Sequence, residues 1–239
     1  MSSFTARRLL PRALLSGSLH YMIRYILFDL DNTLYPESSI LGERFEKGIN
    51  SFVANYLGIS EEEARRQRRE RRREFGTTLQ WLIQVHNFTD IDDYMDAVHP
   101  KRMECYLTKN PALTNIIRSL PVKRSILTNS PREHAERVLS YLEILDQFEQ
   151  IFDLRYNNFV GKPDPAVYSR ILEVIQQRPE ETLFIDDIPG YLEPFRRMGG
   201  HALLIDEMGR HPGGEYPVIQ RIDELPAFLG KEYGLVLNP

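Results

Sequence analysis

The chain is poor in the residues that build disulfides and soft-metal sites. Its 239 residues include one cysteine, Cys105, so an intrachain disulfide is impossible and thiolates are too few for a cysteine-ligated zinc site. The six histidines are scattered, and no two are four residues apart. A metal held by histidines on one helix face is therefore not expected.

An excess of positive charge and long apolar runs are also missing. The chain has 30 Lys and Arg against 34 Asp and Glu, a net charge of −4. Nucleic acid is therefore not expected as a partner, because binding phosphates along a backbone needs a basic footprint. No apolar run approaches the ~18 residues of a membrane-spanning helix. We expect a cytoplasmic protein without a membrane partner.

The N-terminal stretch lacks acidic residues. Residues 1–28 contain four arginines but no Asp or Glu, a composition typical of organelle transit peptides. The alternative is an upstream start, with Met22 beginning the working chain just before the first apolar run, and we favour this reading. In either case residues 1–21 are predicted to lie outside the core.

The chain does contain short apolar runs that are separated by helical patterns. Such runs are typical of buried parallel strands in an α/β fold, and here they occupy residues 24–28, 123–128, 151–154, 182–185 and 201–205. About 95 residues separate the first two runs, far more than one crossover needs. Helical patterns fill that interval at 40–57, 60–75, 78–86, 90–105 and 111–119.

This layout predicts a Rossmann-like parallel sheet with a helical cap domain inserted after the first strand. The core is assigned to residues 22–36 and 112–239, with a short helix near 221–229, and the cap to residues 37–111. Two helix starts are marked in the core. Residues 130–133 (SPRE) read as a capping box, and Asp164-Pro165 repeats the pattern of a capping residue followed by proline.

Polar residues follow four of the predicted core segments. They are Asp29, Asp31, Thr128, Asn129, Lys162, Asp186 and Asp187. The carboxyl ends of parallel strands meet at one edge of the sheet, where such folds bind ligands. Adjacent carboxylates such as Asp186 and Asp187 are costly unless a cation or proton relieves their repulsion. A hydroxyl with free backbone N–H groups at a helix start, as at Thr128, suits an anion.

Four motifs in this order resemble the phosphatase branch of the haloacid dehalogenase-like hydrolase superfamily. They are FDLDNT (28–33), LTN (127–129), GKPDP (161–165) and FIDD (184–187). The resemblance implies that Asp29 is a nucleophile and that Asp31 is a general acid and base. It further implies that Mg²⁺ is the cofactor, bound by Asp29, the backbone carbonyl of Asp31 and the pair Asp186 and Asp187.

The same resemblance implies that Thr128, Asn129 and Lys162 hold the phosphoryl oxygens. Further segments resemble the pyrimidine 5′-nucleotidase group: FDLDNTLYP, FGTTLQWL (75–82) and HAERVL (134–139). This implies a magnesium-dependent phosphatase of nucleoside 5′-monophosphates, with the substrate between cap and core. The departures from that group are Trp81, which could narrow the pocket, and Tyr191, where an Asn commonly follows the acidic pair.

The alternatives to a nucleotidase are a phosphatase or phosphomutase acting on sugar phosphates or other small phosphorylated metabolites. A dehalogenase would not need the acid at Asp31, and a non-catalytic protein would not need all four motifs intact. The expected partner is a small phosphorylated metabolite, and the chain is expected to be a monomer or a homodimer.

Two segments of the cap allow two readings each. Residues 64–75 contain seven arginines, which could form a polyphosphate surface. The favoured reading is a solvated helix with Glu61–Arg65 and Glu62–Arg66 pairs, from which one or two arginines could still reach a substrate. Residues 75–81 are predicted to line the mouth of the pocket, although Phe75 and Trp81 could instead be core contacts between cap helices.

Overall fold

The computed structural model of the chain describes residues 22–212 and 214–238. The predicted extension at residues 1–21 lies outside this range. Within it, a parallel sheet of six strands has the order β3-β2-β1-β4-β5-β6. The strands are β1 (Tyr25–Phe28), β2 (Lys123–Leu127), β3 (Ile151–Phe152), β4 (Thr182–Asp186), β5 (His201–Ile205) and β6 (Val218–Ile219). The five predicted strands are confirmed, and β6 is an addition, too short to leave an apolar pattern in a tail with Gly and Pro.

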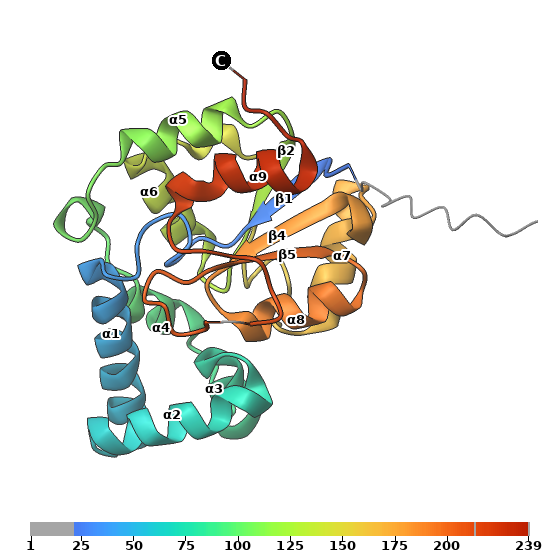
Figure 1. The fold of residues 1–239 in the computed structure, drawn as a ribbon. Helices are drawn as coiled ribbons and strands as arrows, with labels where there is room; N and C mark the ends of the chain where they lie inside the picture. The colour runs from blue at the N-terminus through green and yellow to red at the C-terminus, as the bar shows by residue number, and fades with distance from the viewer. Residues whose placement is uncertain (1–21, 213, 239) are drawn as a thin grey trace, which may run out of the picture.

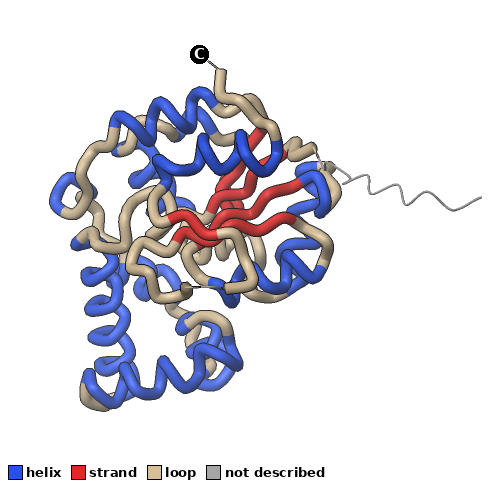
Figure 2. The backbone as a smooth tube through the Cα atoms, in the orientation of Figure 1, coloured by secondary structure: helices blue, strands red, loops and turns tan. Residues whose placement is uncertain are grey.

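Helices cover both faces of the sheet (Figures 1 and 2). One face packs on α5 (Pro111–Ser119), α6 (Arg132–Tyr141) and α9 (Leu225–Tyr233), and the other on α7 (Pro165–Ile175) and α8 (Pro189–Arg197). Strand β1 serves both cores by alternation: Ile26 and Phe28 join the first cluster, while Tyr25 and Leu27 join the second. Burial on both faces explains why the strand reads as a continuous apolar run.

Four helices between β1 and β2 build a separate layer at the lower left of Figure 1. They are α1 (Ile40–Leu57), α2 (Glu61–Phe75), α3 (Thr78–His86) and α4 (Ile91–Val98). Most of their buried side chains form a third apolar cluster, including Val53, Ala64, Leu79, Trp81 and Tyr94. The α/β core with an inserted helical cap is thus confirmed, and we retain residues 37–111 as the proposed limits of the cap.

Most helix bounds match the sequence pattern, because the ends carry clear signals. Thr77 caps α3, its hydroxyl accepting from Gln80 N at 3.1 Å, and α1 ends at Gly58, whose φ of 66° favours glycine. The helix predicted over 90–105 instead ends at Val98, just before Pro100. Short 3₁₀ turns complete the chain at Met103–Cys105, Leu145–Gln147, Pro179–Glu181 and Ile222–Glu224.

The capping box predicted at residues 130–133 does not form. Helix α6 begins at Arg132 after Pro131, without a side-chain cap from its own first turn. The Arg132 N–H instead donates to Asp153 Oδ2 at 3.0 Å, and the Ser130 hydroxyl is used elsewhere. The second predicted start is confirmed, since Asp164 Oδ1 accepts from Ala166 N at 2.9 Å.

The strand register brings the predicted site residues to one edge. Phe28 lies opposite Ile126 on one side and Ile185 on the other, so the residues that follow these three positions meet there. The ladder continues one step further, with Asp29 N donating to Ile185 O at 2.8 Å. None of the helices within the described residues is long and apolar enough to cross a membrane.

Candidate active site

A cleft of about 260 Å³ opens between the carboxyl edge of the sheet and the cap. Its core side is lined by most of the predicted site residues: Asp29, Asp31, Thr128, Asn129, Lys162 and Asp187. Asp186 lies beneath them with its side chain fully buried. The structure therefore brings together all seven residues that the sequence singled out, from four segments far apart in the chain.

Lys162 lies at the centre of the core side. Its Nζ donates to Asp29 Oδ1 at 2.5 Å and to Asp186 Oδ2 at 2.7 Å, although its side chain is only 1% exposed. Burial alone would lower the pKa of Lys162, but the charges of Asp186 and Asp29 prevail and raise it. The ammonium is therefore charged, and it partly neutralises the two buried carboxylates.

Asn129 holds the loop that carries Lys162. Its side-chain oxygen accepts from Lys162 N at 2.9 Å, and its Nδ2 donates to Lys162 O at 3.0 Å. A Cβ at Gly161 would lie 2.6 Å from Asn129 Oδ1, so only glycine permits this approach. The side-chain amide of Asn129 thus positions Lys162, a role that the sequence alone does not suggest.

Asp31 has three hydrogen-bond partners in the described structure. Ser130 Oγ and Tyr35 OH each donate to it at 2.5 Å, and His134 Nε2 lies 2.8 Å from its Oδ1. Burial opposes the ionisation of Asp31. The charge of His134 and the hydrogen bonds outweigh that effect and lower the pKa of Asp31 below its ordinary value.

These three partners were missed from the sequence as functional residues. His134 lies in the HAERVL segment and Tyr35 in FDLDNTLYP, so the nucleotidase-like segments were the available signal. His134 also links the core to the cap, because the centroid of its ring lies 5.0 Å from those of Phe45 and His99.

Three carboxylates form a compact group at the base of the cleft. Asp29, Asp186 and Asp187 offer oxygens that lie within 4.8 Å of one another. Burial raises the pKa of Asp187 to about 7, with Asp186 adding to the effect. Burial likewise raises the pKa of Asp29 well above its ordinary value, and Lys162 offsets this only in part. Three acids around one ammonium leave excess negative charge, and an all-oxygen donor set fits a hard divalent cation.

The two acids of the FIDD motif have different surroundings. Asp186 accepts from Lys162 through Oδ2 and from Ile188 N, at 2.8 Å, through Oδ1. Asp187 lines the cleft, and its Oδ2 accepts a long hydrogen bond from Asn32 Nδ2 at 3.5 Å. Asp187 is therefore the more accessible oxygen donor of the pair.

The cap side of the cleft is both apolar and basic. Its lining includes Phe45, Ile49, Tyr94, Met95 and Val98 together with Arg65, Arg68 and Arg69. The segment at residues 76–79 also lines it, as predicted. Phe75, Gln80 and Trp81 do not line it, so this part of the prediction is wrong. The alternative for Phe75 and Trp81 is confirmed, since both pack in the apolar cluster of the cap. Trp81 is 2% exposed in the core of the cap, because its position on α3 turns the indole toward the other cap helices.

Tyr191, the second departure from the nucleotidase-like pattern, lies over Lys162. Its ring centroid is 5.2 Å from Lys162 Nζ, and its carbonyl accepts from Tyr168 OH at 2.6 Å. The tyrosine therefore shields the buried ammonium.

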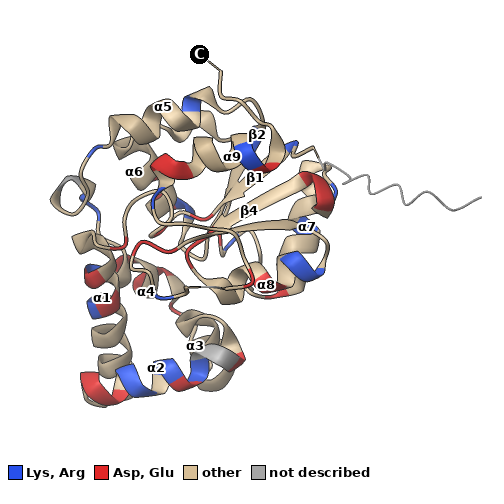
Figure 3. Ribbon diagram, viewed as in Figure 1, with Lys and Arg blue, Asp and Glu red and all other residues tan. Residues whose placement is uncertain are grey.

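The arginine-rich helix α2 alternates basic and acidic positions (Figure 3). Arg66 pairs with Glu63 at 2.5 Å and Glu70 at 2.8 Å. Among the described side chains, the predicted pairs Glu61–Arg65 and Glu62–Arg66 do not form. The reading as a solvated helix therefore holds for its outer face, with different partners, but not for the face that lines the cleft.

Comparison with known proteins places the chain among hydrolases. A family model described as haloacid dehalogenase-like hydrolase matches residues 23–199. "Phosphate metabolism protein 8" of Saccharomyces cerevisiae is 26% identical over 199 residues, which are 77% of this chain but only 62% of the yeast protein. "Phosphorylated carbohydrates phosphatase" of Thermotoga maritima is 23% identical over 181 residues, covering 73% of this chain and 81% of that protein.

Solved structures agree on the fold. The crystal structure of a "HAD phosphatase" from Thermococcus onnurineus has a TM-score of 0.62 and 20% sequence identity, covering 87% of this chain and 98% of that one. At this identity the likeness concerns the fold alone.

Proposed function

Because the chain belongs to the haloacid dehalogenase-like hydrolase family, we propose that it is a magnesium-dependent phosphomonoesterase that works through a phosphorylated Asp29. The observation that carries this proposal is the arrangement at the base of the cleft. The carboxylate of Asp29, which could attack phosphorus, accepts a hydrogen bond from the buried ammonium of Lys162. Two residues further along the chain, a second carboxylate, Asp31, is held by three hydrogen-bond partners.

In the first step an Asp29 carboxylate oxygen attacks phosphorus, and the bond from phosphorus to the ester oxygen breaks. The partners of Asp31 favour its ionised form in the free site, so in this proposal Asp31 takes up a proton when the anionic substrate binds. It then gives that proton to the departing oxygen, which leaves as an alcohol. In the second step Asp31, now ionised, takes a proton from water. The resulting hydroxide attacks phosphorus, releases inorganic phosphate and restores Asp29. The partners of Asp31 stabilise the ionised form that this second step requires.

Thr128 and Lys162 are the groups we assign to the phosphoryl oxygens, together with the backbone N–H of Asn129, because the Asn129 side chain is committed to the Lys162 loop. Fixed donors at that place stabilise charge that develops in the transition state without reorganising. Tyr191 above Lys162 keeps water from the ammonium and so strengthens its field.

The acidic group fits Mg²⁺, with Asp29, Asp187 and the backbone carbonyl of Asp31 as its ligands and Asp186 beneath them. Bound Mg²⁺ would supply neutralisation of the charge shared by these acids and the phosphoryl group. Asp186 keeps Lys162 in place, since both its oxygens accept from fixed donors.

For the substrate we propose a nucleoside 5′-monophosphate. The nucleotidase-like segments support it, and so does the apolar surface of Phe45, Ile49 and Tyr94, against which a base could pack. Trp81 does not line the cleft, so this departure from the nucleotidase-like pattern does not narrow the space for a nucleotide. A phosphorylated carbohydrate is the second candidate, because the Thermotoga relative is named for that class. A phosphomutase would use the same two acids. A cytoplasmic location and a monomer or homodimer remain predictions.

The test is release of inorganic phosphate from p-nitrophenyl phosphate, nucleoside 5′-monophosphates and sugar phosphates, each with Mg²⁺ and with EDTA. We expect turnover with Mg²⁺ that EDTA abolishes, and a folded but inactive Asp29→Asn variant. Phosphate release by that variant well above background would contradict Asp29 as the nucleophile, and full activity in EDTA would contradict the metal. The ranking of the substrates decides between nucleotide and carbohydrate.

A further inference from the structure

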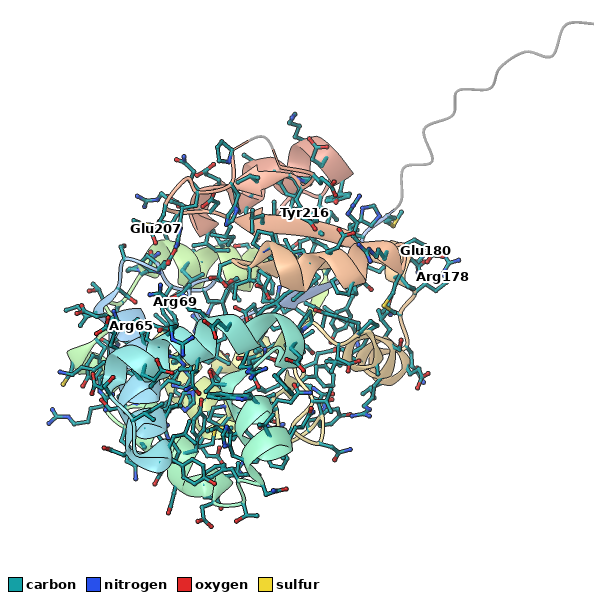
Figure 4. The ribbon with its side chains drawn as sticks, turned by 90° about the horizontal axis from the view of Figure 1, so that it is seen from below. Arg65, Arg69, Arg178, Glu180, Glu207 and Tyr216 are labelled. Atoms are coloured by element: carbon teal, nitrogen blue, oxygen red, sulfur yellow. The ribbon has the colours of Figure 1, made fainter. Side chains whose placement is uncertain are left out.

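Helix α2 pairs its arginines differently on its two faces. On the outer face Arg66 and Arg71 form ion pairs with glutamates of the same helix. On the inner face Arg65, Arg68 and Arg69 line the cleft. Their spacing of three and four residues places them on one side of the helix, and Figure 4 shows the labelled Arg65 and Arg69 along the same edge of α2.

One of the three inner arginines is fixed by its neighbours. Arg68 donates to Glu46 at 3.2 Å, to Thr78 Oγ1 at 3.1 Å and to the Asn50 side chain, and its own side chain is 10% exposed. These contacts tie α2 to α1 and to the start of α3. Arg68 is therefore a structural contact whose charge Glu46 already balances.

Arg65 and Arg69 differ from Arg68. Within the described residues neither has a hydrogen bond or an ion pair, and both are exposed to the cleft. They are four residues apart, a spacing at which like charges on a helix repel. Two uncompensated guanidinium groups on the wall opposite Asp29 and Lys162 are positioned to meet an anion that enters with the substrate.

We propose that Arg65 and Arg69 form a subsite for a second anionic group of the substrate, apart from the phosphoryl group that is transferred. This rests on the proposed phosphatase activity, but it departs from the first substrate candidate, because a nucleoside 5′-monophosphate has no second anion. The expected substrate is a phosphomonoester that also carries a carboxylate or a second phosphate, such as a nucleoside bisphosphate. Guanidinium groups suit both, because their planar N–H pairs match carboxylate and phosphate oxygens. The core side already supplies donors for the transferred phosphoryl in Thr128 and Lys162.

The test compares substrates that differ only in the second anion. Glycerol 3-phosphate is paired with 3-phosphoglycerate, in which a carboxylate replaces the terminal hydroxymethyl group. Uridine 5′-monophosphate is paired with uridine 3′,5′-bisphosphate, which adds a phosphate. The ratio of kcat/KM within each pair is measured for the wild type, Arg65→Gln, Arg69→Gln and the double variant. Arg71→Gln is the matched control, since it removes one positive charge from the outer face of the same helix.

We expect the wild type to prefer the doubly anionic member of at least one pair, and that pair identifies the second group. Each single variant should reduce this preference about tenfold or more, the contribution of a charged hydrogen bond, and Arg71→Gln should keep it. The proposal is overturned if the wild type shows no preference in either pair, or if the double variant retains it. It is also overturned if both members lose kcat/KM equally, because the arginines would then act on the transferred phosphoryl group.

Binding to Asp29→Asn, measured by calorimetry with the same compounds, separates this proposal from the enzymatic one. We expect Asp29→Asn to bind the doubly anionic compound more tightly, and this preference should disappear in a variant that also carries Arg65→Gln and Arg69→Gln. That result supports the subsite even if the wild type hydrolyses none of the four compounds. Equal binding of both members overturns it, whatever the activity of the wild type.

Discussion

Asp187→Asn should make the metal-free protein more stable at pH 7.5, although it removes a proposed metal ligand. Asp187 lies with Asp29 and Asp186 in a group of carboxylates whose oxygens are within 4.8 Å of one another. Without a cation, one ammonium faces all three acids. An asparagine of the same shape removes one charge and therefore relieves repulsion.

The size of the effect follows from the pKa of Asp187, which burial and then Asp186 raise from 3.8 to about 7. Between these values the native state binds more protons than the unfolded state, so the free energy of unfolding falls as pH rises. One pKa unit corresponds to about 1.36 kcal/mol, which sets an upper limit of about 4 kcal/mol on the stability lost by pH 7.5. Asp187→Asn should recover much of that loss.

The assay is urea denaturation at pH 5 and pH 7.5, in EDTA and in Mg²⁺, for the wild type, Asp187→Asn and a control, Asp93→Asn, at an exposed position on α4. In EDTA the wild type should lose stability between the two pH values and Asp187→Asn should lose less. Mg²⁺ should stabilise the wild type by mass action and the variant much less. A variant that is less stable than the wild type in EDTA at pH 7.5 would refute the reasoning, as would equal pH slopes.

Three further substitutions probe the cleft and the cap. Asp31→Asn should lower kcat for a nucleoside 5′-monophosphate by ~10²–10⁴ and lower it less for p-nitrophenyl phosphate, whose leaving group needs no proton; equal losses would argue against proton donation. Lys162→Met should destabilise the metal-free protein by about 3–5 kcal/mol, because it leaves two buried carboxylates without their partner, and a melting temperature equal to that of the wild type would contradict this. Trp81→Ala should lower the free energy of unfolding by about 3–5 kcal/mol and the melting temperature by roughly 6–20 °C, while the order of preferred substrates stays the same. A changed order would indicate that Trp81 contacts the substrate.

The sequence by itself determined the elements and the reactive groups. Apolar runs bounded by polar residues marked the first five strands because a strand buried on both faces must be apolar throughout. Helices at 40–57, 78–86 and 111–119 were predictable to the residue, since their ends carry Gly58, Thr77 and Pro111 as local signals. The seven polar residues at the carboxyl edge could be named in advance, because parallel strands deliver their ends to one place.

Only the tertiary structure decided how side chains with several possible partners are used. Ser130 reads as a helix cap, yet its hydroxyl donates to Asp31, 99 residues away in the chain. The parallel pairing of β1 with β2 brings together the residues that follow these strands and so offers Ser130 a charged acceptor. The local pattern of Trp81 fits a pocket or a core contact between cap helices, and that of Arg65 fits a solvated surface or a substrate contact. Which of them faces the cleft depends on how the cap helices rotate as they bury their shared apolar cluster. That rotation is set by packing between helices, which no spacing within a single helix records.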